Sequence, residues 1–363
     1  MKLIQSNNNP NFIIRYWLVL VPILTTLLAN ILFINSGFNN FRLPLILITS
    51  LIWAVIFGAD LVFKTDINKP DKDLKKFSNW ILIAGAGVHF SLVLSFLFNL
   101  SSFKILRIVN LGDFVSLMVL ILMTGLSLGL GISAIAHELI HRNVKWQKKL
   151  GTAMLFVIGY AHNSVEHIQA HHRLVATSID NSTAKLNQGF WNYFWNNNII
   201  GEYVEAFKIE TERFTKKNLP PYSFQNLVIR YAFLYFWFLV FVLVICGQVA
   251  FFGFLLTVLI AKIFHAAIVY SQHYALTRDV TDKIDCCHSW QTNSLVTEYL
   301  VLGFGNHGEH HVKVTKTYLE INNVDNSPTL PFGYFACSLL ALFPYSWFQK
   351  INPILKNFQK DLN

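Results

Sequence analysis

The chain has 363 residues, of which 53% are hydrophobic and only 13% are charged. Soluble globular proteins carry roughly 25% charged residues, so this composition excludes an ordinary soluble domain and indicates an integral membrane protein. The formal net charge is +9, yet the sequence has no basic stripe interleaved with aromatic residues, and we expect no nucleic-acid partner. The four cysteines contain no C-x-x-C pair, which argues against a disulfide framework.

Six stretches are long and apolar enough for transmembrane helices, which need about 20 residues each. They are residues 12–34, 43–63, 79–99, 114–136, 231–249 and 250–272. Gly247 and Gln248 mark the turn between the last two. The apolar segment 151–161 is too short to span the bilayer, and Pro344 interrupts 333–348, so we expect both to lie at the interface or against the bundle. The predicted fold is an all-α integral membrane protein, with residues 1–363 forming a single membrane domain.

Lys and Arg residues in the loops predict the orientation of these helices. Five lysines lie in 64–78, and Arg142 with three lysines follows the fourth span, whereas the loops 35–42 and 101–113 carry one and two basic residues. This bias predicts that both termini face the cytoplasm, and we expect the membrane to be a bacterial inner membrane. The segments 137–228 and 273–363 would then form a cytoplasmic cap.

Nine of the thirteen histidines fall into four tight groups in this predicted cap. The groups are His137 and His141, then His167, His171 and His172, the single His273, and finally His307, His310 and His311. Neutral imidazole is the commonest protein metal ligand, and histidines four residues apart share one face of a helix and can bind one ion together. Nine imidazoles are too many for one catalytic zinc, which takes three protein ligands. We therefore expect two metal ions, and iron suits both the imidazole ligands and O2 chemistry.

Two other functional classes fit parts of the sequence. The segment His137-Glu-Leu-Ile-His141 matches the H-E-x-x-H signature of zinc proteases, in which Glu138 would be the general base. That interpretation leaves the other seven histidines of the groups unexplained. A membrane metal transporter would need polar residues along its spans, and the predicted spans offer little besides His89 and His265. Packing explains His89 well, whereas His265 could either pack or support a ligand.

The histidine groups resemble the histidine boxes of the membrane alkane 1-monooxygenases. These enzymes belong to the integral-membrane di-iron superfamily that also contains fatty-acid desaturases and xylene monooxygenase. The matching segments are HELIHR at 137–142, EHIQAHH at 166–172, QHYAL at 272–276 and NHGEHH at 306–311, with further similarity at 288–290 and 330–334. The family's Glu before the single histidine is Gln272 here, and its Asp in the last box is Glu309. None of these differences removes a ligand.

The resemblance implies a monooxygenase that uses O2 and two non-haem irons, held by the nine histidines, to hydroxylate an unactivated C–H bond. The carbon would be a terminal one in an alkane-like substrate taken from the bilayer. Electrons would come from a rubredoxin or ferredoxin-type donor with its reductase, because the chain has no flavin, nicotinamide or iron–sulfur motif. The alternative on the same scaffold is a fatty-acid desaturase, or a hydroxylase of aryl-methyl (xylene-type) or fatty-acyl substrates.

Several residues near the histidines or within the spans could have supporting roles. Four residues adjoin histidines of the groups and could orient an imidazole by accepting its second N–H: Glu138, Glu166, Gln272 and Glu309. A solvated carboxylate is the alternative for Glu138. Trp53, in the middle of the second span, could limit how deep an alkyl chain enters, although ordinary packing explains it as well. Asp60 either caps the interface or lines a pathway, and His162 and His288 could support the ligands.

Overall fold

The computed structural model describes residues 14–35, 42–64, 75–102 and 111–362. In these residues the chain forms helices and loops, with two isolated β-bridges that pair Lys64 with Ser294 and Gln291 with Thr329. The predicted all-α class is therefore confirmed.

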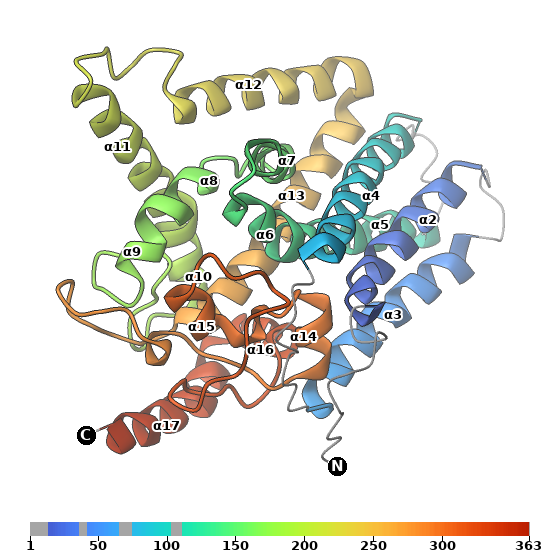
Figure 1. Cartoon of the computed structure of the whole chain (residues 1–363). Coiled ribbons are helices and arrows are strands. Elements are labelled where there is room, and N and C mark those ends of the chain that lie inside the picture. The colour runs from blue at the N-terminus through green and yellow to red at the C-terminus, as the bar shows by residue number, and fades with distance from the viewer. Residues whose placement is uncertain (1–13, 36–41, 65–74, 103–110, 363) are drawn as a thin grey trace.

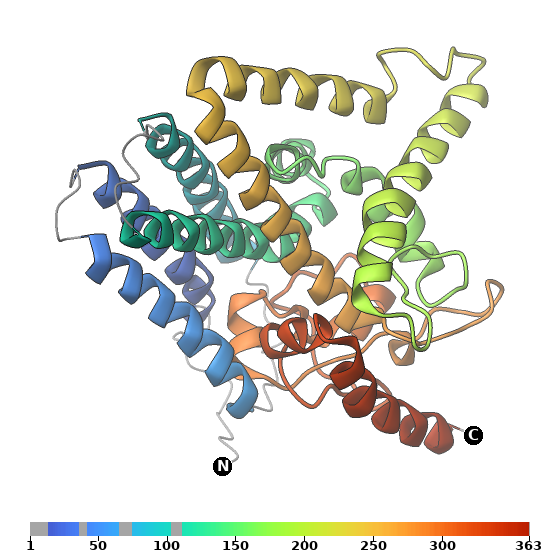
Figure 2. The ribbon, with the colours of Figure 1, turned by 180° about the vertical axis from the view of Figure 1, so that it is seen from behind.

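Five long helices pack together as a bundle (Figures 1 and 2). They are α2 (Leu20–Asn35), α3 (Arg42–Val62), α4 (Lys75–Ser102), α5 (Leu111–Leu130) and α13 (Gly247–His273). Large apolar side chains such as Leu51 and Leu94 are exposed on the outer faces of the bundle. Helices that are apolar on every side are typical of membrane spans, because lipid rather than water contacts their outer faces.

Four helical stretches among the described residues are long and apolar enough to cross a membrane. They are Tyr16–Phe33, Ser78–Ser102, Phe114–His141 and Leu227–His273, and α3 adds the shorter apolar stretch Ile46–Val62. A membrane protein is thus supported, whereas the count of six spans and the cytoplasmic orientation remain predictions. Four of the twelve basic residues behind the predicted orientation lie outside the described residues: Lys69, Lys72, Lys104 and Arg107.

The last of these stretches changes direction at Gly247. It consists of α12 (Leu227–Phe241), the π-helical segment η6 (Val242–Cys246) and α13. Gly247 has a φ of +86°, a conformation that glycine adopts without the steric cost of a side chain. From this turn α12 runs toward α11 (Glu202–Thr215) instead of returning along the bundle (Figures 1 and 2).

The remaining helices surround one end of α5 and α13. The central segments are η3 (Gly131–Ala136), α6 (His137–His141), α7 (Lys145–Val157), α8 (Asn163–Glu166), η4 (His167–His171), α9 (His172–Leu174), α10 (Phe190–Asn192) and η5 (Tyr193–Gly201). The C-terminal ones are α14 (Leu295–Leu300), α15 (His307–Val312), α16 (Tyr334–Ala341) and α17 (Pro344–Leu362), and the 3-10 turns are η1 (Tyr16–Val19), η7 (Cys286–His288) and η8 (Phe304–Asn306). The predicted break at Pro344 is confirmed, because it is the first residue of α17, where its missing N–H costs no helical hydrogen bond.

Asp60 attaches the C-terminal segment to the bundle. Its buried carboxylate accepts hydrogen bonds from Ser294, from Thr297 Oγ1 at 2.9 Å and from the Ala336 N–H at 3.0 Å. Its carbonyl oxygen accepts from the N–H of Gly333, and a Cβ at Gly333 would overlap the carboxylate. Asp60 therefore connects α3 with α14 and α16, and α16 packs against α13, the helix that ends at His273.

Candidate metal centre

The structure gathers all nine predicted histidines into two neighbouring groups. The five-histidine group contains His137, His141, His167, His172 and His310, and the four-histidine group contains His171, His273, His307 and His311. Within each group the ligand nitrogens lie within 4.8 Å of one another. The histidine segments are far apart in the sequence, so the fold itself assembles both groups.

The spacing of the imidazole nitrogens fits a metal ion in each group. In the five-histidine group, Nε2 of His167 lies 2.8 Å from that of His137, 3.0 Å from that of His141 and 3.1 Å from that of His172. In the four-histidine group, Nε2 of His307 lies 3.0 Å from that of His273 and 3.1 Å from that of His311. Two nitrogens bound to one ion at about 2.0–2.1 Å and at right angles would be about 2.9 Å apart.

Burial favours the neutral, metal-binding form of several of these histidines. Burial, reinforced by neighbouring imidazoles, lowers the pKa of His167, His172 and His310 well below 6.5. The same causes lower the pKa of His307 and His311. A buried imidazole that stays neutral at pH 7 keeps a lone pair available for an ion.

Ordinary helical turns explain two of the pairings. His137 and His141 lie one turn apart on α6 and belong to the five-histidine group, and His307 and His311 lie one turn apart on α15 and belong to the four-histidine group. This agrees with the expectation for histidines four residues apart. His310 lies beside His311 on α15 but belongs to the five-histidine group, so α15 contributes to both.

The second histidine segment departs from that expectation because η4 is a π-helix. Its i→i+5 hydrogen bonding brings residues five apart to one side, and His167 and His172 both belong to the five-histidine group. His171, four residues after His167, belongs to the other group. A spacing of four residues therefore does not place this pair in one group.

Two residues that the sequence did not single out orient histidines of the four-histidine group. The two carboxylate oxygens of Asp180 each lie 3.1 Å from His171 Nδ1, and Ser289 Oγ lies 3.3 Å from His273 Nδ1. Asp180 also accepts a hydrogen bond from Thr183 Oγ1 at 2.6 Å. Partners of this kind fix the ring and leave the other nitrogen for the metal. Asp180 lies in a Ser-, Asn- and Thr-rich loop, whose composition resembles that of any turn.

Two of the predicted supporting carboxylates are held by cations. Glu138 is buried and forms an ion pair with Arg142 at 2.9 Å, so the alternative of a solvated carboxylate is wrong. Glu309 accepts hydrogen bonds from Lys313 at 2.7 Å and Lys316 at 3.0 Å. Burial alone would raise the pKa of Glu309, but these lysines and the N–H of Asn322 outweigh it and lower that pKa. Glu309 therefore ties α15 to the loop that follows it.

The other two predicted neighbours, Glu166 and Gln272, lie deeper in the protein. Glu166 is buried, and neither of its carboxylate oxygens has a hydrogen-bond partner among the described residues. Burial, together with the charges of Glu202 and Asp180, raises its pKa well above the usual value. Gln272 lines the cavity beside the histidines, whereas the Tyr334 hydroxyl near it donates its hydrogen bond to the carbonyl oxygen of Trp290 at 3.0 Å.

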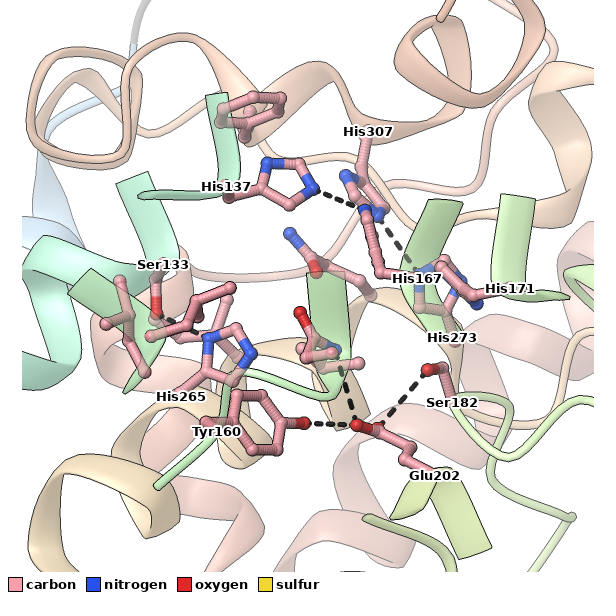
Figure 3. A pocket seen from close by; sticks show the side chains of 17 residues that line it. Ser133, His137, Tyr160, His167, His171, Ser182, Glu202, His265, His273 and His307 are labelled. Atoms are coloured by element: carbon pink, nitrogen blue, oxygen red, sulfur yellow. Dashed lines mark hydrogen bonds between the residues drawn. The ribbon is translucent and has the colours of Figure 1, made fainter. Parts of the chain in front are cut away.

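This cavity has a volume of about 30 Å³ and lies against both histidine groups (Figure 3). Five histidines of the two groups line it: His137, His167, His171, His273 and His307. One part of its wall is apolar, formed by Ile132, Leu155, Ile268, Val269 and Phe304, and another is polar, formed by Ser133, Tyr160, Asn163, Ser182, Glu202 and His265. His265 Nδ1 lies 2.8 Å from Ser133 Oγ. His265 thus lines the cavity and pairs with Ser133, a position that differs from both roles considered from the sequence, packing or support of a ligand.

A second, larger cavity lies on the other side of the turn at 159–162. Its volume is about 290 Å³, and Phe156, Tyr203, Tyr235 and Phe236 are among the residues that line it. Ala161 and His162 line this cavity, whereas Tyr160 lines the first one. The second cavity, lined mainly by aromatic and aliphatic side chains, therefore adjoins the polar wall of the first.

Four other singled-out residues lie outside both histidine groups. Trp53 is buried, packs against Phe57, Phe264 and Phe335, and is absent from the lining of the cavity beside the histidines. His89 is buried against Gly131. His162 contacts the rings of Tyr160 and Tyr203, with centroids 5.0 and 5.1 Å away, and His288 Nδ1 accepts a hydrogen bond from the Asp285 N–H at 2.9 Å.

Comparison with known proteins places this centre in a family context. Residues 114–326 match the family model of the fatty acid desaturases. The chain is 29% identical to alkane 1-monooxygenase 2 of Pseudomonas aeruginosa over 68% of its own length and 66% of that protein's length. It is 30% identical to alkane 1-monooxygenase 2 of Alcanivorax borkumensis, over 61% of the chain and 60% of the relative.

A third relative is named as a component of a xylene/toluene monooxygenase and not as an alkane 1-monooxygenase. The hydroxylase component of the xylene/toluene monooxygenase of Pseudomonas putida is 26% identical over 62% of the chain and 61% of its own length. All three matches thus span less than two thirds of the relative.

Proposed function

Because the chain belongs to the fatty acid desaturase family, we propose that it is a membrane monooxygenase. It would use O2 to hydroxylate an unactivated C–H bond, a terminal one, in an alkane-like substrate drawn from the bilayer. The nine histidines would hold two non-haem irons, one in each group. We further propose a single membrane domain with six spans, and with the metal centre and both termini at the cytoplasmic face of a bacterial inner membrane.

The observation that carries this proposal is the pair of buried imidazole groups against one cavity. Nitrogen ligands in this number suit iron, and iron supports O2 chemistry. A zinc protease would use three of the nine and would have no role for the others. The names of the relatives point in the same direction, since two are alkane 1-monooxygenases and the third is a component of a monooxygenase.

The side chains around the cavity suggest how the chain would assist the reaction. When bound, the irons would supply the chemistry by which O2 is reduced and a C–H bond is oxidised. Asp180 and Ser289 would hold His171 and His273 in fixed orientations. Ile132, Leu155 and Ile268, on the apolar part of the cavity wall, would contact an alkyl group beside the histidines. The adjoining cavity of about 290 Å³ would accept more of a hydrophobic chain.

Electrons would come from a separate carrier, because the sequence has no motif for a redox cofactor besides the histidines. We propose a rubredoxin or ferredoxin-type donor with its reductase. Lys145, Lys148 and Lys149 are exposed on α7, which packs against the α6 helix that bears His137 and His141. A basic surface this close to the metal ligands would attract an acidic electron carrier.

The direct test feeds cells that express the chain together with rubredoxin and its reductase. Octane, hexadecane, xylene and a fatty acid are supplied separately, and products are identified by gas chromatography and mass spectrometry. A primary alcohol from an alkane is the expected result, and cells with the His310→Ala variant serve as the matched control. An alkene would favour the desaturase alternative, and a benzylic alcohol alone would favour the aryl-methyl hydroxylase. Absence of any product, with iron bound, would refute the proposal.

A further inference from the structure

We propose that Tyr160 and Glu202 form a proton relay that supplies the cavity beside the histidines. This inference rests on the proposed function, because hydroxylation consumes protons. A C–H bond is broken and a C–O bond is formed with one oxygen atom of O2, while the other atom leaves as water. The balance requires two electrons, which a one-electron carrier protein delivers singly, and two protons. Those protons must reach a centre whose surroundings are buried.

The cavity is of a suitable size and polarity for such a transfer. Its volume of about 30 Å³ has room for one or two water molecules, since a site for one water needs roughly 10–15 Å³. Five ligand histidines line one part, and Tyr160, Ser182 and Glu202 line another (Figure 3). A hydroxyl and a carboxyl group therefore face the same small space as the histidines.

Tyr160 and Glu202, which both face this space, are joined to each other by a hydrogen bond. The Tyr160 hydroxyl donates to Glu202, and Asn198 Nδ2 donates to both, at 2.8 Å to Glu202 Oε1 and at 2.7 Å to the Tyr160 oxygen. Ser182 Oγ and Asn163 Nδ2 each lie 3.4 Å from the carboxylate. These donors hold the carboxylate in place but are neutral. In the described part of the chain, Glu202 makes no ion pair with Lys or Arg that would fix it in the charged form.

The charges around Glu202 suit a group that exchanges protons near neutral pH. Burial raises the pKa of Glu202 to about 7, and the hydrogen bonds from Tyr160 and Asn198 only partly offset it. The titratable groups near it on other elements are Glu166 on α8, His171 on η4, Asp180 in the following loop, Tyr193 on η5 and Lys262 on α13. None of them is hydrogen-bonded to the Glu202 carboxylate.

The helix that carries Glu202 also leads toward the surface. Glu205 follows it by one turn on α11, and its side chain is 21% exposed and pairs with Lys208 at the surface. Glu205 therefore places a partly exposed carboxyl group on the same helix as Glu202, one turn away, where a proton could be taken up from solvent.

The test compares Glu202→Gln and Tyr160→Phe with Glu210→Gln in the full-length, iron-loaded protein. Glu210 is an equally buried carboxylate on α11, but it pairs with Arg213 and does not line the cavity. Loss of a positioned proton donor typically slows a reaction by 10²–10⁴-fold, so we expect product formation to fall at least about tenfold in the first two variants. Iron content should be unchanged in all three, and Glu210→Gln should keep the wild-type rate.

Three further measurements separate a relay from a structural role. The wild-type rate should fall as pH rises above about 7, because the protonated donor is lost, whereas the lower rate of Glu202→Gln should not change across that range. Glu202→Asp should recover part of the rate. In infrared spectra of the metal-free protein, the band of a protonated carboxyl that titrates near pH 7 should be absent from Glu202→Gln.

The outcomes are distinguishable. An active wild type with equally active Glu202→Gln or Tyr160→Phe variants would overturn the relay, as would loss of iron in both variants. A wild-type protein that binds iron yet gives no product from any substrate would refute the proposed function itself. If Glu202→Gln does not fold, the rate, pH profile and iron content of Tyr160→Phe decide the question.

Discussion

Asp180 holds Nδ1 of His171 between its two carboxylate oxygens, each 3.1 Å away. The contact is buried and fixes the ring with its other nitrogen directed to the four-histidine group. A carboxylate in this position also makes the imidazole a stronger donor to a metal. The pair was not evident from the sequence, where Asp180 is one polar residue among several in a loop.

Replacing Asp180 tests this contact. Asp180→Asn should lower metal affinity by about 10–100-fold, the usual effect of removing a partner of a ligand histidine. Iron retained after gel filtration under anaerobic conditions is the measurement. Asp279→Asn, in an exposed loop, is the control and should retain iron fully. Equal iron retention in both variants would mean that Asp180 only supports the loop.

Removing a ligand histidine should abolish activity. His310→Ala and His171→Ala each delete a nitrogen from one group, and we expect no detectable product with strongly reduced iron content. His288→Ala should keep iron and most of the activity, because the His288 side chain caps a short turn at Asp285. Elemental analysis that finds one zinc and no iron in the wild type would contradict the proposed centre and favour the protease interpretation.

Gln272 offers a way to change the charge of the cavity without removing a ligand. Ser289 lies at His273 Nδ1, whereas Gln272 lines the cavity. Gln272→Glu would therefore add negative charge close to both groups and should raise iron retention several-fold, up to about tenfold. Gln272→Leu, which is similar in size and uncharged, is the control. Iron loss in Gln272→Glu would mean that the cavity wall needs a neutral side chain at this position.

Gly333 should tolerate no side chain. Its alanine variant would force the Asp60 carboxylate and the start of α16 apart, at a cost of about 1–3 kcal/mol in the free energy of unfolding. Thermal melting in detergent measures the effect. Gly58→Ala is the matched control on α3, because nothing lies within 4 Å of a Cβ there. That substitution should be neutral or slightly stabilising, since glycine is a poor helix former. Equal melting temperatures would contradict the close contact.

His162 should make the protein less stable in acid. Burial, with a smaller effect of Lys262, lowers its pKa from 6.5 to about 3. In the unfolded chain this histidine takes up a proton below about pH 6.5, whereas in the folded chain it stays neutral, so the free energy of unfolding falls as pH decreases through that window. The melting temperature of metal-free His162→Leu should decline less steeply below pH 6.5 than that of the wild type. Parallel declines would show that His162 is protonated in the fold.

The parts of the site that could be predicted are those with a regular spacing. His137 with His141 and His307 with His311 lie on α-helical turns, and the box pattern found all nine histidines. Their division into groups of five and four could not be predicted, because it depends on the π-helical hydrogen bonds of η4. The sequence His-Ile-Gln-Ala-His contains no residue pattern that predicts i→i+5 hydrogen bonding.

The residues of the polar wall of the cavity could not be predicted either, because no sequence pattern connects them. Tyr160, Ser182 and Glu202 belong to a turn, a loop and the start of a helix, and each is a single residue of a common type. Hydropathy located the apolar helices but not how they pack, so it could not show that Asp60 meets Gly333 or that α12 departs from the bundle at Gly247.

Two short segments each serve both histidine groups. η4 with α9 supplies His171 to one group and His167 and His172 to the other, and α15 supplies His310 to one and His307 and His311 to the other. The first ion to bind would order both segments, and the second would find its ligands already in place. The two binding events would then share a favourable coupling free energy. Titration with a chelator should release both ions in a single step, and the half-loaded protein should be scarce even when Asp180 is replaced.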